Sequence, residues 1–143
     1  MKQKILLVDD DADDQLFFID ALNEINAEVH CEITKNGSEA LNRLEQEPLP
    51  DMIFLDLNMP VMNGFDCLAE LRKRDDLDHI PVIIYSTTSD HSTVKKTHEL
   101  GANAFFKKPN DFPSMRTKLE ELLQKNFVKR DSNHQFSLNE FSF

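Results

Sequence analysis

Five short apolar runs alternate with segments of helical spacing, and this alternation restricts the fold more than any other feature of the sequence. Apolar runs of this length with few charges are typical of strands that are buried on both faces of a parallel sheet. The intervening segments carry apolar residues three or four positions apart, as in Phe18, Leu22 and Ile25. The sequence therefore predicts a (βα)5 chain, an α/β fold with a doubly wound, five-stranded parallel sheet and helices on both faces. The expected strands are Ile5 to Val8, Val29 to Thr34, Met52 to Leu55, Pro81 to Tyr85, and Ala104 to Phe106.

Local signals place the ends of two helices. Ser89 stands where an N-cap is expected, and Gly101 stands where the same helix should end. Val94 and Leu100 are the main apolar residues of this helix, so we expect it to be held lightly against the sheet. Pro113 fits the first turn of the last helix, where a missing N–H costs nothing.

Composition excludes several classes of function. The chain has 143 residues, 26 acidic against 16 basic side chains and a net charge of −10, so direct binding to nucleic acid or to an anionic membrane is not expected. No apolar run is long enough for a signal peptide or a membrane span, which predicts a cytoplasmic location. Cys31 and Cys67 lack a C-x-x-C spacing and are interpreted as reduced core residues.

Acidic side chains follow two of the predicted strands. Right-handed crossovers bring the carboxyl ends of parallel strands to one edge of the sheet, and there Asp9 and Asp10 would meet Asp56. Carboxylates crowded together repel one another, but together they suit Mg²⁺. An alternative is that Asp9 and Asp10 only cap the helix that begins near residue 12. The neighbouring Asp11, Asp13 and Asp14 are expected to face solvent or the start of that helix.

The fourth and fifth strands add different groups to the same edge. The run that ends in "IIYSTTSD" brings the hydroxyl of Ser86, and the run that ends in "AFFKKPNDF" brings Lys107 or Lys108. An acidic pair, a single aspartate, a hydroxyl and a lysine are then expected to share one site.

Four motifs stand in order along the chain: "LLVDDD" at the first strand, "LDLNMPVMNG" at the third, "YST" at the fourth and "KKP" at the fifth. Together they resemble the receiver domain of two-component response regulators. The similarity covers about residues 3 to 125, and it implies a flavodoxin-like fold with strand order 2-1-3-4-5. It also implies a receiver domain over residues 3–127, with residues 128–143 as a short tail and no separate effector domain expected.

The resemblance assigns a role to each acidic residue. It implies that Asp56 accepts a phosphoryl group from a histidine kinase. Asp10 and Asp56 would bind Mg²⁺ directly, or Mn²⁺ in its place. Asp9 would act through water or a hydrogen bond, and the backbone carbonyl of Asn58 would be a further metal ligand.

The remaining site residues follow from the same resemblance. Ser86 and Lys108 would bind phosphoryl oxygens, and Phe105 stands where the family has a switch aromatic. The family lysine directly precedes proline, which selects Lys108 over Lys107, and the bond to that proline is usually cis. Gly64 fits the family glycine, where a loop turns before a helix.

The expected function is that of a two-component response regulator that signals to a downstream protein, and not that of an enzyme beyond its own phosphotransfer and autodephosphorylation. One alternative is a phosphorelay intermediate that passes the group to a histidine phosphotransferase. Another is a magnesium-dependent phosphohydrolase with an aspartyl-phosphate intermediate, although Asn58 stands where such enzymes carry a second aspartate. A pseudo-receiver would lack Asp56, Asp10 or Lys108, and all three are present. No i, i+4 pair suggests a metal or relay role for His30, His79, His91, His98 or His134.

The tail is unusually aromatic for a disordered segment. In an extended conformation, Phe136 and Leu138 would share one side, and so would Phe141 and Phe143. The tail is either a frayed end or a segment that docks its rings on its own domain or on a second copy, which would allow a weak homodimer.

Overall fold

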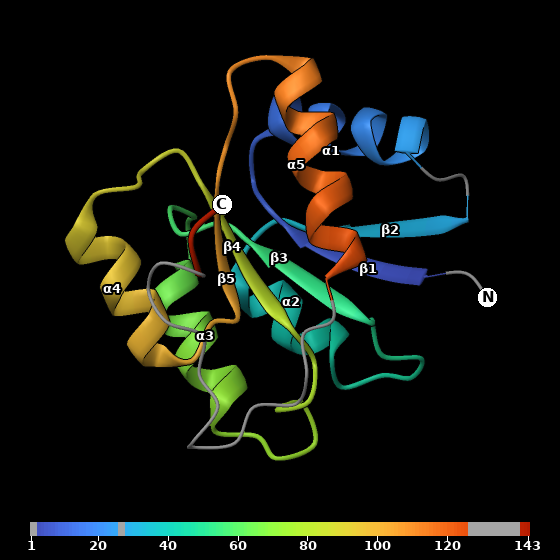
Figure 1. Cartoon of the computed structure of the whole chain (residues 1–143). Helices are drawn as coiled ribbons and strands as arrows, with labels where there is room; N and C mark the ends of the chain where they lie inside the picture. Colours follow the sequence, from blue (N-terminus) through green and yellow to red (C-terminus); the bar gives the residue numbers. More distant parts are fainter. Residues whose placement is uncertain (1–2, 26–27, 126–140) are drawn as a thin grey trace.

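The computed structural model of the chain describes residues 3–25, 28–125 and 141–143, and strands and helices alternate along it as the sequence predicts (Figure 1). All neighbouring strands are parallel and their order is β2-β1-β3-β4-β5, so the predicted fold class and strand order are confirmed. The strands are β1 (Gln3–Val8), β2 (Val29–Thr34), β3 (Met52–Leu55), β4 (Val82–Ser86) and β5 (Ala104–Lys107). The helices are α1 (Ala12–Ile25), α2 (Gly37–Arg43), α3 (Gly64–Arg72), α4 (His91–Leu100) and α5 (Phe112–Gln124).

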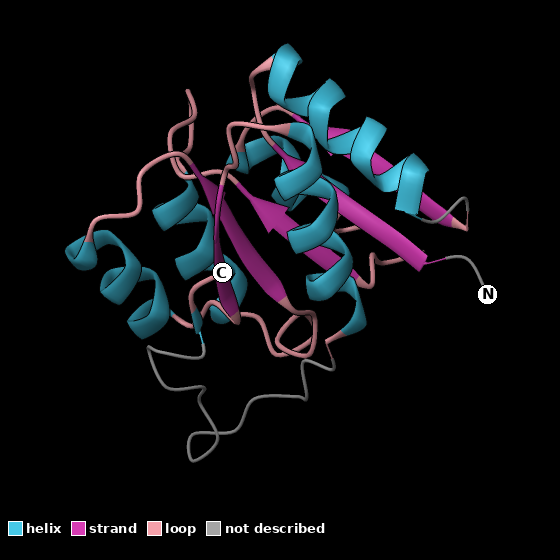
Figure 2. Ribbon diagram, turned by 45° about the horizontal axis from the view of Figure 1, so that its top comes forward, coloured by secondary structure: helices cyan, strands magenta, loops and turns pink. Residues whose placement is uncertain are grey.

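The sheet separates two apolar cores. Side chains alternate along β1, so that Leu6 and Val8 enter one core while Ile5 and Leu7 enter the other. Helices α2, α3 and α4 cover the first face, and α1 and α5 cover the second (Figure 2). Burial on both faces explains why the strands are almost continuously apolar.

Helix α4 begins one residue later than the sequence predicts. The N-cap is Asp90 and not Ser89, because a carboxylate oxygen of Asp90 accepts the backbone N–H of Thr93. Gly101 ends the helix at φ 107°, in the left-handed region, as predicted. Val94 is one of the few buried side chains of α4, which agrees with a lightly held helix. The expected position of Pro113 in the first turn of α5 is also confirmed.

Backbone hydrogen bonds continue the sheet one residue beyond three strands. Asp9 N–H donates to Thr34 O at 3.0 Å, and Asp56 N–H donates to Val8 O at 2.9 Å. Lys108 N–H donates to Ser86 O at 2.8 Å. The sheet therefore fixes the backbone of Asp9, Asp56 and Lys108 at the carboxyl edge.

Only part of the tail lies within the described residues. Phe136 and Leu138 fall outside them, whereas Phe141 and Phe143 fall inside. The prediction that Phe141 and Phe143 share one side is wrong, because Phe141 joins the core beneath α3 and α4 while Phe143 packs against the core of the opposite face. The bridge to β5 forms at Ser142, so the alternation of an extended strand does not reach back to Phe141.

Among the described residues, no helix combines the length and the apolar character that crossing a bilayer requires.

Candidate functional site

Three carboxylates converge at the carboxyl edge of the sheet. One oxygen atom from each of Asp9, Asp10 and Asp56 lies within 4.8 Å of the other two. Asp9 is fully buried and Asp56 is 6% exposed, whereas Asp10 is exposed to solvent. The convergence follows from the parallel topology, since Asp9 follows the end of β1 and Asp56 follows the end of the neighbouring β3. In the part of the chain that the structure describes, this is the one group of three or more His, Cys, Asp or Glu side chains placed to hold a metal ion.

Lys108 is the cation of this site. Its ammonium nitrogen lies 2.7 Å from Asp14 Oδ2, 3.0 Å from Asp9 Oδ2 and 3.5 Å from Asp56 Oδ2, and its side chain is 8% exposed. Lys107 is exposed, and none of the ion pairs of the described residues involves it. The expected cis bond to the following proline is wrong, because the one cis peptide bond of the described residues joins Glu47 and Pro48.

Asp14 lies at the start of α1, one of the two positions predicted for it, but it also belongs to the site, which was not predicted. Its carboxylate accepts a hydrogen bond from Lys108 at 2.7 Å, shorter than the distance from Lys108 to Asp56. The first turn of α1 begins after three residues beyond the end of β1 and so lies beside the same edge, but the sequence pattern does not distinguish Asp14 from the exposed Asp13. Asp11 instead caps α1 by accepting the N–H of Asp14 at 3.0 Å, as predicted for that residue.

Burial and neighbouring charges shift the pKa values of the site residues in opposite directions. Burial raises the pKa of Asp56 from 3.8 to about 6, although the neighbouring Lys108 ammonium favours the ionised form. Burial also raises the pKa of Asp9. Burial alone would lower the pKa of the Lys108 ammonium group. The carboxylates of Asp14, Asp56 and Asp9 have the larger effect, so the pKa of this group is raised.

The other predicted site residues surround this cluster. Ser86 is fully buried at the end of β4, and its hydroxyl oxygen accepts the N–H of Thr88 at 3.2 Å. Phe105 is fully buried on β5, within the core beneath α3 and α4. Asn58 lies two residues after Asp56 and is exposed.

Gly64 is required by a close approach of two backbone segments. A Cβ atom at this position would lie 2.2 Å from Asp56 O and 2.8 Å from Leu57 Cα. The N–H of Gly64 donates to Leu57 O at 2.9 Å, which fixes the start of α3 against the residue that follows Asp56. The prediction assigned Gly64 to a turn, whereas the structure shows that contact with the backbone of Asp56 excludes a side chain.

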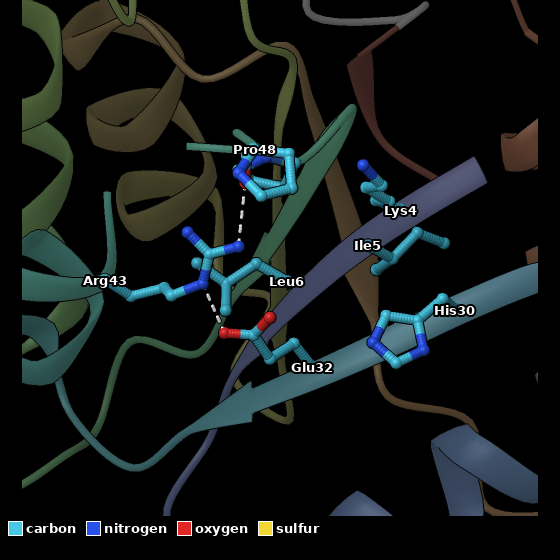
Figure 3. Close-up of a pocket in the computed structure, with 8 residues that line it drawn as sticks. Lys4, Ile5, Leu6, His30, Glu32, Arg43 and Pro48 are labelled. Atoms are coloured by element: carbon cyan, nitrogen blue, oxygen red, sulfur yellow. Dashed lines mark hydrogen bonds and ion pairs between the residues drawn. The ribbon is translucent and has the colours of Figure 1, made fainter. Parts of the chain in front are cut away.

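A separate hollow of about 230 Å³ lies over the amino-terminal halves of β1 and β2, away from the carboxylates (Figure 3). It is lined by Leu6, His30 and Arg43, among others. The guanidinium group of Arg43 is already occupied by an ion pair with Glu32 and a 2.8 Å hydrogen bond to Pro48 O. The hollow therefore offers no unpaired arginine to a ligand.

The raised pKa of Asp56 predicts a dependence of stability on pH. Because the folded-state pKa of about 6 exceeds the unfolded value of 3.8, the folded state binds more protons between these limits. The free energy of unfolding should therefore fall as pH rises from 4 to 7, by up to about 3 kcal/mol from this group. Asp56→Asn should remove this fall in urea unfolding with EDTA present, and so be the more stable chain at neutral pH. A difference between the two chains that stays constant over this range would contradict the assignment.

Comparison with known proteins assigns the architecture to a family. The model of the response regulator receiver domain matches residues 5–120, which include all five strands from Ile5 onward and the whole carboxyl edge. Response regulator Rcp1 of Synechocystis is 30% identical over 117 residues, which cover 78% of this chain and 80% of Rcp1. The transcriptional regulatory protein CrdR of Helicobacter pylori is 32% identical over 120 residues, which cover 84% of this chain and 54% of CrdR. The chain thus spans most of one relative and about half of the other.

Solved structures agree in fold over nearly the whole chain. The crystal structure of the Mn(2+)-bound form of Rcp1 superimposes with a TM-score of 0.77 at 27% identity, covering 90% of this chain and 99% of that one. The phosphorylated cyanobacterial phytochrome response regulator RcpA gives a TM-score of 0.78 at 27% identity, covering 85% of this chain and 91% of that one.

Proposed function

The chain belongs to the response regulator receiver family, and from this premise we propose that Asp56 accepts a phosphoryl group from a histidine kinase and thereby controls contact with a protein partner. One observation carries the proposal. Asp56 is a buried carboxylate that lies close to the carboxylates of Asp9 and Asp10 and 3.5 Å from the Lys108 ammonium nitrogen. An acidic pair that can hold a cation and a buried lysine beside one carboxylate are the groups that phosphoryl transfer to that carboxylate needs.

The transfer itself needs a nucleophile and neutralised oxygens. A carboxylate oxygen of Asp56 attacks phosphorus as the bond to the donor imidazole nitrogen breaks, and the electron pair of that bond stays on the nitrogen. With a pKa of about 6, Asp56 is mostly ionised at neutral pH and so carries the lone pair that the attack requires. Lys108 would leave Asp14 and pair with the phosphoryl oxygens as charge gathers on them.

The residues present fit a divalent cation. Asp9 Oδ2 is buried beside the Lys108 ammonium nitrogen at 3.0 Å, and one oxygen from each of Asp9, Asp10 and Asp56 lies within 4.8 Å of the other two. Hard oxygen ligands of this kind suit Mg²⁺, and a relative's structure contains Mn(2+). We assign Asp10, Asp56 and the Asn58 carbonyl as ligands, with Asp9 acting through water or a hydrogen bond. When bound, the ion would supply positive charge to the phosphoryl oxygens.

The response to phosphorylation would pass through β4 and β5. Ser86 ends β4 and is paired in register with Lys107 of β5. A phosphoryl group on Asp56 would draw the Ser86 hydroxyl towards it, and Phe105 and the lightly held α4 could then repack. The changed surface around α4 and β5 would be the signal that a partner protein recognises.

Metal-dependent labelling tests this proposal. Acetyl phosphate with Mg²⁺ should add one phosphoryl group, detected by intact mass, and EDTA should abolish the addition because the acidic site then lacks its cation. Asp10→Asn should raise the Mg²⁺ concentration required. Asp13→Asn is the matched control, since Asp13 is an exposed carboxylate of the same cluster in the sequence. Labelling that persists in EDTA would contradict the proposal.

A further inference from the structure

The outer edge of β5, which we call the free edge because no strand of the sheet pairs with it, bonds to residues 141–143. We call these residues the docked segment. Phe143 N–H donates to Phe105 O at 2.7 Å, and Lys107 N–H donates to Phe143 O at 3.3 Å. Ser142 forms a parallel bridge with Phe105. Because β5 is the outermost strand, the docked segment extends the sheet beyond it, and Figure 1 shows the segment in red beside β5. This pairing has the geometry of strand addition, in which main-chain bonds join a peptide to a sheet edge.

The first aromatic ring of the docked segment enters the core. Phe141 is fully buried and joins the apolar cluster that contains Val94, Ala102 and Phe105. Its ring meets the ring of His98 edge-on, with centroids 4.9 Å apart and an interplanar angle of 84°. A phenylalanine with no exposed surface marks a shaped recess between α4 and β5, which its side chain fills.

The second aromatic ring lies on the opposite face of the sheet. Phe143 packs against the core cluster of that face, and the ammonium group of Lys125 lies 4.8 Å from the centre of its ring. Ser142, between the two rings, is exposed. The edge of β5 thus accommodates an aromatic residue on each face and requires little of the residue between them.

We propose that the free edge of β5 is a peptide-binding site for a segment of the form Phe-x-Phe. Residues 141–143 fill this site in the unaltered chain. Filling the site opposes phosphorylation of Asp56. The binding site stands on the contacts above. The effect on phosphorylation rests in addition on the proposed function.

The same end of β5 serves both the docked segment and the phosphoacceptor site. Lys107 donates its N–H to the docked segment and is paired in register with Ser86, while Lys108 N–H donates to Ser86 O at 2.8 Å. With the segment docked, the Lys108 ammonium lies 2.7 Å from Asp14 and 3.5 Å from Asp56. A phosphoryl group on Asp56 would draw Lys108 and the end of β5 towards itself. The docked segment holds that end in place, so docking and phosphorylation oppose each other, and each weakens the other by the same factor.

Peptide binding tests the site without phosphorylation. The full chain with Phe141→Ala and Phe143→Ala presents the β5 edge without its rings, and the probe is the peptide LNEFSF, the sequence of residues 138–143. We expect saturable binding in NMR titration, with the largest amide shifts at Phe105 and Lys107. A peptide with serine in place of both phenylalanines is the control. No binding, or equal binding of the two peptides, would overturn the site.

The rate of phosphorylation by acetyl phosphate tests the coupling. The variant with both Phe141→Ala and Phe143→Ala should be phosphorylated on the order of tenfold faster than the unaltered chain. Leu41→Ala is the control, because Leu41 packs against the same core from α2, far from β5, and so lowers stability without touching the docked segment. A rate that is unchanged or slower in the double variant would overturn the coupling.

The unaltered chain provides a readout that needs no substitution. On phosphorylation, the Phe143 amide should exchange with deuterium several times faster, because its bond to Phe105 O weakens. Unchanged protection in a chain whose mass shows the added phosphoryl group would overturn the coupling and leave the proposed function intact. If no chain is phosphorylated, the proposed function and the coupling fail together, while the peptide titration still decides the binding site.

Discussion

Gly64→Ala should lower the free energy of unfolding by about 3 kcal/mol and abolish phosphorylation of Asp56. The added Cβ would lie 2.2 Å from Asp56 O, a distance that no real Cβ contact tolerates. The neighbouring atoms, Leu57 Cα and the carbonyl carbon of Asp56, are also backbone, so no flexible side chain can move aside. Relief requires a shift of the backbone that positions the phosphoacceptor itself. Urea unfolding gives the first quantity, and intact mass after acetyl phosphate treatment gives the second.

Gly37→Ala is the matched control for this substitution. A Cβ at Gly37 would meet Met62 Cγ at 2.7 Å and Cys67 Cβ at 2.9 Å, both of them side-chain atoms. Met62 can change its rotamer, so the cost should be smaller and phosphorylation should persist. If the two alanine variants lose equal stability and both remain phosphorylated, the contact between Gly64 and Asp56 does not have the role assigned to it.

Lys108→Ala should leave the domain folded but slow phosphorylation on the order of a hundredfold, the usual cost of removing one preorganised charge from a phosphoryl or oxyanion site. The side chain is buried among carboxylates and not in the apolar core, and its ammonium nitrogen is the described cation nearest to Asp56. Lys108→Ala protein that does become phosphorylated should not show the proposed repacking of Phe105 and α4, because the lysine would link the phosphoryl group to the end of β5. Amide spectra before and after acetyl phosphate treatment measure that change.

Lys107→Ala is the control for charge and position. Its side chain is exposed, and alanine keeps the backbone N–H that bonds to Phe143 O. Phosphorylation and the spectral change should therefore persist. A larger effect at Lys107 than at Lys108 would show that the site uses the other lysine.

The sequence was sufficient for the topology and for the convergence of the carboxylates. Strands buried on both faces must be apolar throughout, so β3 and β4 are recognisable without any periodicity. Once the strands are parallel, Asp9 and Asp56 must meet at one edge, because both directly follow their strands. The N-cap of α4 was misplaced by one residue because Ser89 and Asp90 are both good caps, and only the bond from Thr93 N–H distinguishes them.

Contacts that depend on tertiary geometry were not predictable. Asp14 reaches Lys108 across 94 positions of the sequence, and nothing in the local pattern separates it from the exposed Asp13. The sequence also did not reveal why residue 64 must be glycine, since the cause is a backbone contact with Asp56 that no local motif indicates. The recess that Phe141 fills is built from α4 and β5 and exists only after they pack.

Locating the phosphoryl group tests the central claim most directly. The unaltered chain and Asp56→Asn are treated with acetyl phosphate and Mg²⁺, reduced with borohydride to trap acyl phosphates, digested and mapped by mass spectrometry. Our account predicts one modified position, Asp56, in the unaltered chain, and no modification of the peptide that contains Asn at this position. Modification at Asp9, Asp10 or Asp14, or equal labelling of the two chains, would contradict it.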